Sequence, residues 1–580
     1  MGFRVEQNVM VPMRDGTLLA TDIWIPEGTP CATLVVRVPY GKSAMFVLSL
    51  RVNPDIFTLL DAGYAVVRQD CRGTSASDGD FVPMENEHDD GVDTVEWVRE
   101  QPWSNGVVGA FGASYLGFTQ LALASKNPPG LAAIAPSVTN PDLYRAWHSD
   151  GGALTWHNAV FWATSMGVAD VLRSGANGDG DRERLQSLLA DVTALQASPD
   201  TLLRDAMPAD RELLAELHPW WSEWLQHPGN DDFWHTRSPV TDHSTVMVPA
   251  LHIGGWFDLF AGDTTRTYAR LRSEAGTEHA REGQQLVMGP WDHQSYTGMY
   301  KDRQFGPTAD IAAIDITSTY LRFYDKWLRN TTDTAGAAPV RIFVMGIDEW
   351  RDEEDWPLPD TTYVEYFLDS SGDANSSDGG GAISRVLPAT EASDSYTYDP
   401  TSPVPSLGGR VWQPSALNLV GPVDQSDIEK RDDVLCYTTP VLSAAVEVTG
   451  HVSLVLHVTS SASDTDFTGK LVDVHPDGRA IYLTDGMLRV RYRDTAGPQL
   501  MAPGTVYEIT LDLSVTSNVF LPGHRIRLEV SSSAYPRYDR NTNTGGDINE
   551  EGLHESVVAQ NRVIHGPDHR SRLILPIIER

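Results

Sequence analysis

The segment at residues 107–117, VVGAFGASYLG, constrains the fold of this chain more than any other part of the sequence. A β-rich run at 107–111 passes through two small residues to Ser114, and a helical pattern begins at Tyr115. Only small side chains fit beside so sharp a turn, which holds a hydroxyl at a sheet edge and a helix N-terminus. The pattern departs from G-x-S-x-G, because the second glycine, Gly117, comes three residues after the serine. A serine that only caps the helix is the alternative.

Short β-rich runs alternate with helical patterns over the first 140 residues and again from residue 250. Such alternation predicts a mostly parallel sheet with helices on both faces. We expect strands at 8–12, 18–25, 33–38, 64–69, 107–111, 131–135, 250–253, 285–288 and 340–344. We expect helices at 55–60, 89–100, 115–125, 263–272 and 310–328.

Two regions depart from this alternation. Residues 141–238 are helix-like and hold seven of the 16 tryptophans, so we expect a helical cap inserted into an α/β core formed by 1–140 and 239–349. From 350 to 580, short alternating runs are separated by Gly, Ser, Asp and Pro, including 481–483 and 487–492. This pattern predicts an all-β sandwich, of which the jelly roll is one type.

A serine nucleophile needs a general base and a group that orients the base. In α/β-hydrolases these groups follow the serine in the order acid, then histidine, at the ends of later strands. Asp258 and His293 follow two successive expected strands, and the carboxyl ends of parallel strands meet at one edge of a sheet. Ser114, Asp258 and His293 are therefore the predicted catalytic triad. The alternatives are that Asp258 is an ordinary turn residue and His293 an ordinary surface-loop residue. Asp292 is not chosen as the acid because it is adjacent to His293, and His252 is not chosen as the base because it lies inside a strand and is expected in the core.

The oxyanion of an acyl-transfer reaction needs hydrogen-bond donors. The backbone N–H of Tyr115, the residue after the serine, is one candidate. The phenolic O–H of Tyr40, in the loop after the strand expected at 33–38, is the other. A tyrosine packed at an interface is the alternative for Tyr40.

Longer segments carry a resemblance that spans nearly the whole chain, among them VPMRDGTLLATDIW, DCRGTSASDGDFVP, GASYLGFTQ, GGWFDLF, GPWDH and DTDFTGKLVDVHPDGRAI. Through them the sequence resembles the cocaine-esterase family of serine hydrolases, which is related to the X-prolyl dipeptidyl-peptidase group. The resemblance implies an α/β-hydrolase core, a helical cap and a C-terminal jelly-roll domain. It carries the triad over to Ser114, Asp258 and His293, and the oxyanion hole to Tyr40 and the N–H of Tyr115.

The resemblance also implies an aromatic acyl pocket between the three parts of the chain. Trp147, Trp162 and Phe260 match pocket positions, and Trp412 is a candidate in the loop RVWQ, where the family has apolar residues. We expect the polar neighbours of Trp412 in this loop, Arg410 and Gln413, to alter the pocket wall that the loop forms. Helix packing is the alternative for the cap tryptophans, and we prefer it for Trp220, Trp221 and Trp224.

These signals predict a serine carboxylesterase that forms an acyl-enzyme, needs no cofactor or metal, and prefers aromatic acyl groups such as benzoyl, as in cocaine-like esters. The alternatives are an X-prolyl dipeptidyl-peptidase, a β-lactam acylase and an α-amino-acid ester hydrolase. Enzymes of this kind that bind a free amine need an anion in the pocket, for which Asp142 and Asp150 are candidates. A binding protein with a decayed hydrolase core is a further alternative.

Charge and cysteine content bear on partners and location. The formal net charge of −35 at pH 7 argues against nucleic acid and anionic membranes, which leaves a small-molecule ester as the expected partner. The cysteines, Cys31, Cys71 and Cys436, suggest neither a disulfide framework nor a zinc site. No signal-peptide pattern and no run of 18 apolar residues is visible, so we expect a cytoplasmic enzyme. The natural ester and the oligomeric state stay open.

Overall fold

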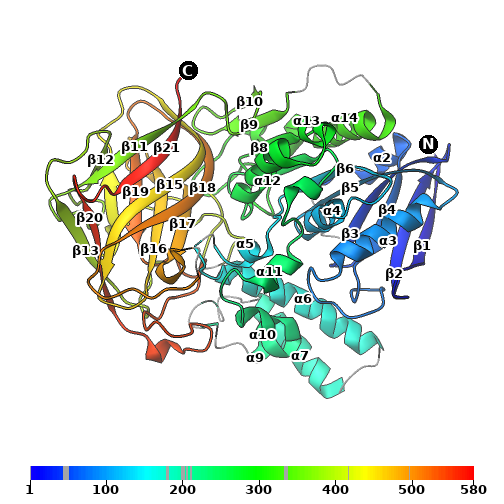
Figure 1. Cartoon of the computed structure of the whole chain (residues 1–580), viewed down its shortest axis with the longest axis horizontal. Helices are drawn as coiled ribbons and strands as arrows, with labels where there is room; N and C mark the ends of the chain where they lie inside the picture. The colour runs from blue at the N-terminus through cyan, green and yellow to red at the C-terminus, as the bar shows by residue number, and fades with distance from the viewer. Residues whose placement is uncertain are drawn as a thin grey trace.

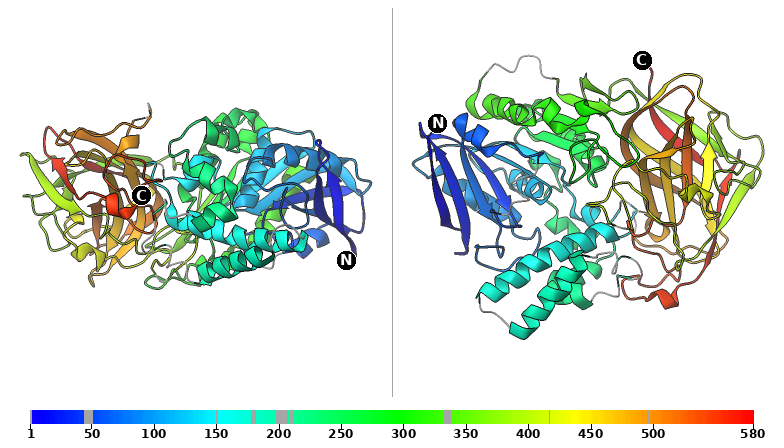
Figure 2. Two further views of the ribbon diagram at one scale, coloured as in Figure 1. Left: turned by 90° about the horizontal axis from the view of Figure 1, so that it is seen from below. Right: turned by 180° about the vertical axis from the view of Figure 1, so that it is seen from behind.

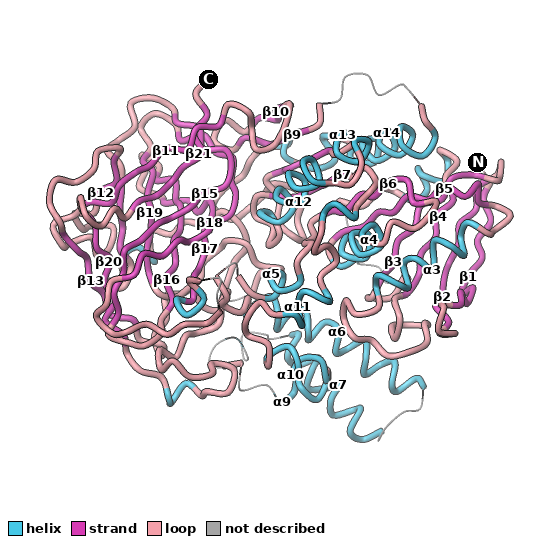
Figure 3. Tube along the Cα trace, viewed as in Figure 1, coloured by secondary structure: helices cyan, strands magenta, loops and turns pink. Residues whose placement is uncertain are grey.

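The structure is a computed structural model that describes residues 2–43, 51–149, 151–177, 182–197, 203, 207–208, 212–331, 338–415, 417–494 and 497–580. Figure 1 shows an α/β core on the right, cap helices below it and a strand-rich domain on the left. In Figure 3 the long helices all lie in the core and cap, and the left-hand domain is strand and loop with a few short turns of helix. The predicted fold class, an α/β-hydrolase core with a cap and an all-β jelly-roll domain, is confirmed.

The core is built on a ten-stranded sheet with the order β1-β2-β4-β3-β5-β6-β7-β8-β9-β10. The strands from β4 to β9 in this order are parallel, whereas β1, β2 and β10 pair antiparallel with their neighbours. The strands are β1 Phe3–Pro12, β2 Leu18–Pro26, β3 Cys31–Val38, β4 Ala65–Asp70, β5 Ser104–Ala113, β6 Leu131–Ser137, β7 Leu251–Gly255, β8 Gln285–Gly289, β9 Val340–Val344 and β10 Glu349–Glu353.

Helices cover both faces of this sheet, which is why β3, β4 and β7 are buried at every position. In β3, Leu34 and Val36 join an apolar cluster with α2 and α14, whereas Val35 joins another with α3, α12 and α13. The core helices are α2 Ile56–Asp61, α3 Glu87–Arg99, α4 Tyr115–Ser125, α12 Ala261–Glu274, α13 Glu278–Glu282 and α14 Ile316–Arg329.

Two features of the core differ from the sequence expectation. The helix expected at 310–328 is interrupted at Asp315, whose φ of 47° is left-handed, and its carboxylate caps α14 by accepting the N–H of Ser318. The expected start at residue 310 was wrong, because Ile311–Ile314 form a separate 3₁₀ turn capped by Asp310. The sheet also continues past residue 349, since the polar edge strand β10 pairs with β9.

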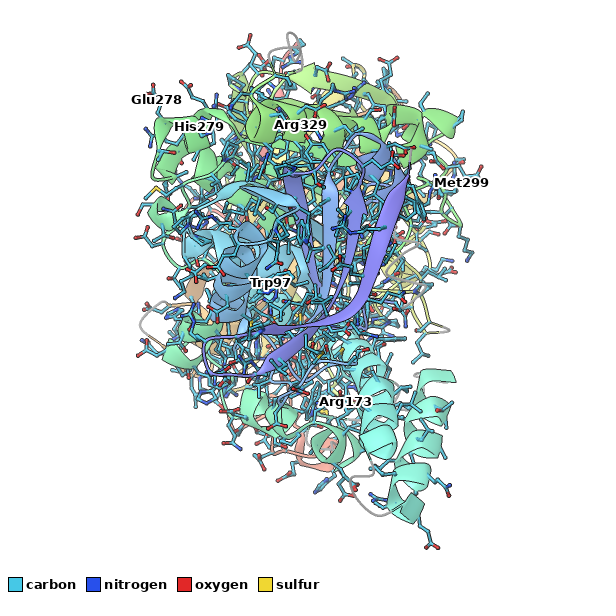
Figure 4. All side chains as sticks on the ribbon, turned by 90° about the vertical axis from the view of Figure 1, so that its right-hand side faces the viewer. Trp97, Arg173, Glu278, His279, Met299 and Arg329 are labelled. Carbon is cyan, nitrogen blue, oxygen red and sulfur yellow. The ribbon has the colours of Figure 1, made fainter. Side chains whose placement is uncertain are left out.

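The cap lies between β6 and β7, and Figure 2 shows its two long helices projecting below the core in the right-hand view. Its helices are α5 Leu143–Trp147, α6 Trp156–Asn177, α7 Arg182–Ala197, α9 Glu212–Leu217, α10 Pro219–Leu225 and α11 Asp232–Arg237. Arg173 of α6, labelled in Figure 4, donates to the carbonyls of Gly73 and Gly79 at 2.6 and 2.9 Å. This side chain holds the cap against the loop that follows β4. No described helix, in cap or core, is long and apolar enough to cross a membrane.

The C-terminal domain is an eleven-stranded sheet that curls round one apolar core. Among its described strands, every pairing is antiparallel except a short parallel one between β12 and β14. The runs expected at 481–483 and 487–492 form a single strand, β17, followed by a 3₁₀ turn at Val490–Tyr492. The strands are β11 Thr361–Asp369, β12 Ala382–Ser384, β13 Ala392–Tyr398, β14 Leu435–Thr438, β15 Val446–Ser460, β16 Asp466–Val474, β17 Ala480–Arg489, β18 Tyr507–Phe520, β19 Arg525–Ser531, β20 Ala559–His565 and β21 Arg572–Ile578.

The two sheets share this apolar core. Trp256 and Phe257, which follow β7, belong to the same cluster as Tyr482 of β17. The rings of Phe257 and Tyr482 lie 6.4 Å apart. The loop that carries Asp258 is therefore anchored in the contact between the domains.

Candidate active site

Ser114 is the single residue between the end of β5 and the start of α4, and its backbone has φ 61° and ψ −123°. A residue other than glycine adopts this conformation only under strain that the surrounding structure must balance. A Cβ at Gly112 would lie 2.5 Å from the side chain of Leu116, and a Cβ at Gly117 would lie 2.7 Å from that of Thr139. The second glycine therefore falls three residues after the serine because α4 packs against Thr139 there.

The structure brings the three predicted triad residues together. His293 Nε2 lies 3.0 Å from Ser114 Oγ, and His293 Nδ1 lies 2.6 Å from Asp258 Oδ2. Ser114 comes from the end of β5, Asp258 from the loop after β7, and His293 from the loop after β8. The arrangement allows the imidazole to take a proton from the hydroxyl while the carboxylate fixes its orientation.

Asp258 is fully buried, yet both of its carboxylate oxygens have donors. Oδ1 accepts the backbone N–H of Phe260 at 2.7 Å, and Oδ2 faces His293. The ring of Phe260 packs edge-on to the imidazole of His293, with centroids 5.7 Å apart. Asp292 turns away, as expected, and its carboxylate accepts the N–H groups of Gln294 and Ser295.

Tyr40 reaches the site from the loop after β3, and its phenolic oxygen accepts the indole N–H of Trp162 at 3.0 Å. Burial raises the pKa of Tyr40 to about 12, against hydrogen bonds with Trp162 and Ser114 that lower it. The phenol is therefore protonated near neutral pH. Because its oxygen accepts from Trp162, the phenol can donate its own proton on the side of Ser114, with which it is also hydrogen-bonded.

Tyr115 offers its backbone N–H in the first turn of α4, where such groups have no partner within the helix. Its phenol lies in a buried network that the sequence analysis missed. The phenol donates to Glu87 at 2.9 Å and accepts the N–H of Met84 at 2.8 Å, and Glu87 is also bound by Arg37 at 2.6 Å. Burial, then the charge of Glu87, raises the pKa of Tyr115 well above its usual value. This network fixes the residue that follows the serine.

An apolar pocket opens beside Ser114, and all four predicted pocket residues line it: Trp147, Trp162, Phe260 and Trp412. The rings of Trp147 and Trp162 lie 5.0 Å apart and form one wall. Further lining residues carry no local signal in the sequence and were missed: Met84, Phe118, Asn158 and Leu259. The tryptophans assigned to packing are buried behind this wall: Trp220, Trp221 and Trp224.

Trp412 reaches the pocket from the C-terminal domain because the cap holds its backbone. The backbone N–H of Trp412 donates to Asn158 Oδ1 at 2.8 Å. The expectation that Arg410 and Gln413 alter this wall was wrong, since neither lines the pocket. Arg410 turns into the β domain, where it donates to Thr484 at 2.6 Å.

The carboxylate of Asp142, proposed as an anion for binding amines, is engaged elsewhere. It caps α5 by accepting the backbone N–H of Arg145 at 3.2 Å, and it lies 3.8 Å from the guanidinium of the same residue. The other candidate, Asp150, lies outside the described residues.

Comparison with known proteins adds family evidence. Residues 15–295 match the model of the X-Pro dipeptidyl-peptidase (S15) family, and 333–574 match that of the X-Pro dipeptidyl-peptidase C-terminal non-catalytic domain. Cocaine esterase from Rhodococcus sp. (strain MB1 Bresler) is 47% identical over 586 residues, covering 100% of this chain and 99% of the relative.

Two solved structures have the same fold over their length. An aminopeptidase from a marine sediment Thaumarchaeota archaeon is 26% identical with a TM-score of 0.81, covering 100% of this chain and 97% of that one. An α-amino acid ester hydrolase is 24% identical with a TM-score of 0.78, covering 99% and 96%. These likenesses cover the core, the cap and the β domain together.

Proposed function

Because the chain belongs to the cocaine-esterase branch of the X-Pro dipeptidyl-peptidase (S15) family and is a serine hydrolase that acts on esters, we propose that it cleaves small esters with aromatic acyl groups. Ser114 is the nucleophile, His293 the general base, and Asp258 the group that orients the base. The observation that carries this assignment is the chain of contacts at 3.0 and 2.6 Å from Ser114 through His293 to Asp258.

The reaction takes place in two steps. Ser114 Oγ attacks the ester carbonyl while its proton moves to His293 Nε2, and the imidazolium then gives this proton to the departing alcohol. Water, deprotonated by the same nitrogen, attacks the acyl-enzyme and releases the acid. Throughout, Asp258 balances the positive charge of the imidazolium.

The tetrahedral intermediate carries a negative oxygen in both steps. Tyr40 O–H and the backbone N–H of Tyr115 are the proposed donors to it. The protonated phenol of Tyr40 and its contacts with Trp162 and Ser114 support this role, because they direct the phenolic proton toward the place where the substrate carbonyl meets Ser114.

The aromatic preference rests on the pocket. Trp147, Trp162, Phe260 and Trp412 present flat apolar surfaces beside Ser114, which suit a benzoyl-like group. The relative named cocaine esterase supports tropane-type benzoyl esters as candidates. The pairing of Asp142 with Arg145 favours neutral acyl groups over substrates with a free amine.

The deciding experiment compares initial rates on 4-nitrophenyl benzoate, 4-nitrophenyl acetate and the 4-nitroanilide of proline. We expect fast turnover of the benzoate, slower turnover of the acetate and none of the anilide. Ser114→Ala should abolish turnover without loss of fold. Cleavage of the anilide at a comparable rate would instead favour the peptidases, and full activity of Ser114→Ala would remove the nucleophile from the proposal.

We also propose the cytoplasm as the location, since Cys31, Cys71 and Cys436 are all buried free thiols, as is common in a reducing compartment.

The proposed division into a core of 1–140 and 239–349, a cap of 141–238 and a β domain of 350–580 is supported by the helices between β6 and β7. The position of β10 in the first sheet favours moving the last boundary beyond residue 353.

A further inference from the structure

A cavity of about 300 Å³ lies on the β domain, away from Ser114, and two histidines and an aspartate face it. Asp473 is near the end of β16, His475 is in the turn between β16 and β17, and His524 is in the turn between β18 and β19. Strands β16 and β19 are hydrogen-bonded neighbours with Asp473 opposite Ile526, so their register holds Asp473 close to His524.

We propose that Asp473, His475 and His524 bind one divalent transition-metal ion, and that Zn²⁺ is the ion which their two nitrogens and one carboxylate fit best. The sequence analysis predicted no metal site. His524 is far along the chain from the other two residues, so no local spacing motif marks the group.

The three ligand atoms lie within 4.8 Å of one another, which is close to the spacing round a tetrahedral ion. His524 Nδ1 lies 2.8 Å from Asp473 Oδ1, and His475 Nε2 lies 3.8 Å from Asp473 Oδ2. With metal–ligand bonds of about 2.0–2.1 Å, neighbouring donors in a tetrahedron are about 3.3 Å apart. The two separations, each to a different oxygen of Asp473, fall on either side of this value. Side-chain rotations would therefore bring the three donors round one ion. The cavity leaves room for water as the fourth ligand.

The charges round the site also suit a cation. Asp473 contributes a negative charge. Two guanidinium groups lie close by, but each has its own carboxylate: Arg303 pairs with Asp348 at 2.6 Å and Arg479 with Asp477 at 2.8 Å.

The position indicates a structural role. The ion would join two turns of the β domain, and the far wall of the cavity comes from the core, through Arg303 and Phe305 and through the β9–β10 turn at Met345 and Asp348. Bound zinc would therefore stabilise the β domain next to the loop that follows His293. Metal that binds only the folded state raises its stability.

The test is a titration of chelator-treated, full-length protein with ZnCl₂, followed by calorimetry and by thermal unfolding. We expect a site that takes one equivalent of zinc and raises the Tm, and His475→Gln should weaken zinc binding at least about tenfold and remove the Tm shift. Ester turnover of His475→Gln should equal that of the wild type, which shows that the variant is folded.

His227→Gln is the matched control, because His227 forms a lone histidine–carboxylate pair with Asp231 at 2.7 Å. It should leave zinc binding unchanged. Asp473→Asn is a second variant that keeps the side-chain shape, and it should lose the visible spectrum of tetrahedral Co²⁺ that the wild type gives. The proposal fails if the wild type binds no zinc, or if the wild type and His475→Gln bind it equally.

Discussion

Trp162 donates its indole N–H to the phenolic oxygen of Tyr40 over 3.0 Å, so a cap side chain orients a core residue beside Ser114. A buried phenol with its oxygen occupied in this way has one direction left for its proton. The cap is therefore connected to the proposed oxyanion hole as well as to the acyl pocket.

Removing either end of this contact should lower kcat more than it raises KM. Tyr40→Phe should lower kcat on 4-nitrophenyl benzoate by about 10² to 10³, as loss of an oxyanion donor does. Trp162→Phe keeps an aromatic wall but loses the N–H, and should cost about fivefold, the value of one hydrogen bond. The double variant should be no slower than Tyr40→Phe. An effect of Trp162→Phe on KM alone would mean that Trp162 serves only as a wall.

The backbone at Ser114 predicts a gain of stability on losing the nucleophile. Glycine adopts φ 61° and ψ −123° without the strain of a Cβ, which costs about 1–3 kcal/mol. Ser114→Gly should therefore be more stable than Ser114→Ala by about 1 kcal/mol, after the greater chain entropy of glycine is subtracted. Both variants should lack turnover. Thermal or denaturant unfolding of the two, compared with the wild type, makes the measurement, and equal stability would contradict it.

Asn158 should control the aromatic preference through Trp412. Asn158→Ala removes the acceptor for the backbone N–H of Trp412 at 2.8 Å. It should therefore loosen the part of the pocket wall that Trp412 forms. We expect KM for 4-nitrophenyl benzoate to rise severalfold, with little change for 4-nitrophenyl acetate. Asn158→Asp keeps an acceptor oxygen at the same place and should restore most of the benzoate affinity. Equal effects on the two esters would show that Asn158 does not act through the acyl wall.

His252 should contribute to acid instability. It is buried with Nε2 2.9 Å from Gln284 Oε1, and burial lowers its pKa from 6.5 to about 4. Below pH 6.5 the unfolded chain binds a proton that the folded protein does not, so this residue's contribution to stability is lost as the pH falls toward 4.

The Tm of His252→Gln should therefore fall less than that of the wild type between pH 7 and pH 5. His554→Gln, at an exposed position, is the control and should follow the wild type. An identical fall in Tm for His252→Gln and the wild type would contradict the expectation.

Much of the site could be located from local pattern. Ser114 is marked by the small residues that a sharp turn requires, and Asp258 and His293 by their places after successive strands. Each depends on a short stretch of chain and on the rule that parallel strands end at one edge. The sequence therefore predicted which residues the structure brings together.

Contacts between distant segments left no such signal. Asn158 and Trp412 are 254 residues apart, and the network of Glu87 and Tyr115 forms through tertiary packing. The polar strand β10 was missed because an edge strand needs no apolar face. The break at Asp315 did have a signal, since Asp310 and Asp315 are both good cap residues.

The pocket wall includes Phe260 from the core, Trp162 from the cap and Trp412 from the β domain. Trp412 lies on a loop of the C-terminal β domain, and this domain supplies no residue to the proposed triad. Substitutions there could change which esters are accepted while the bond-breaking machinery is inherited intact. Families built this way can change their substrate range through mutations in the C-terminal β domain. An engineer could exchange this domain between relatives to change substrate preference.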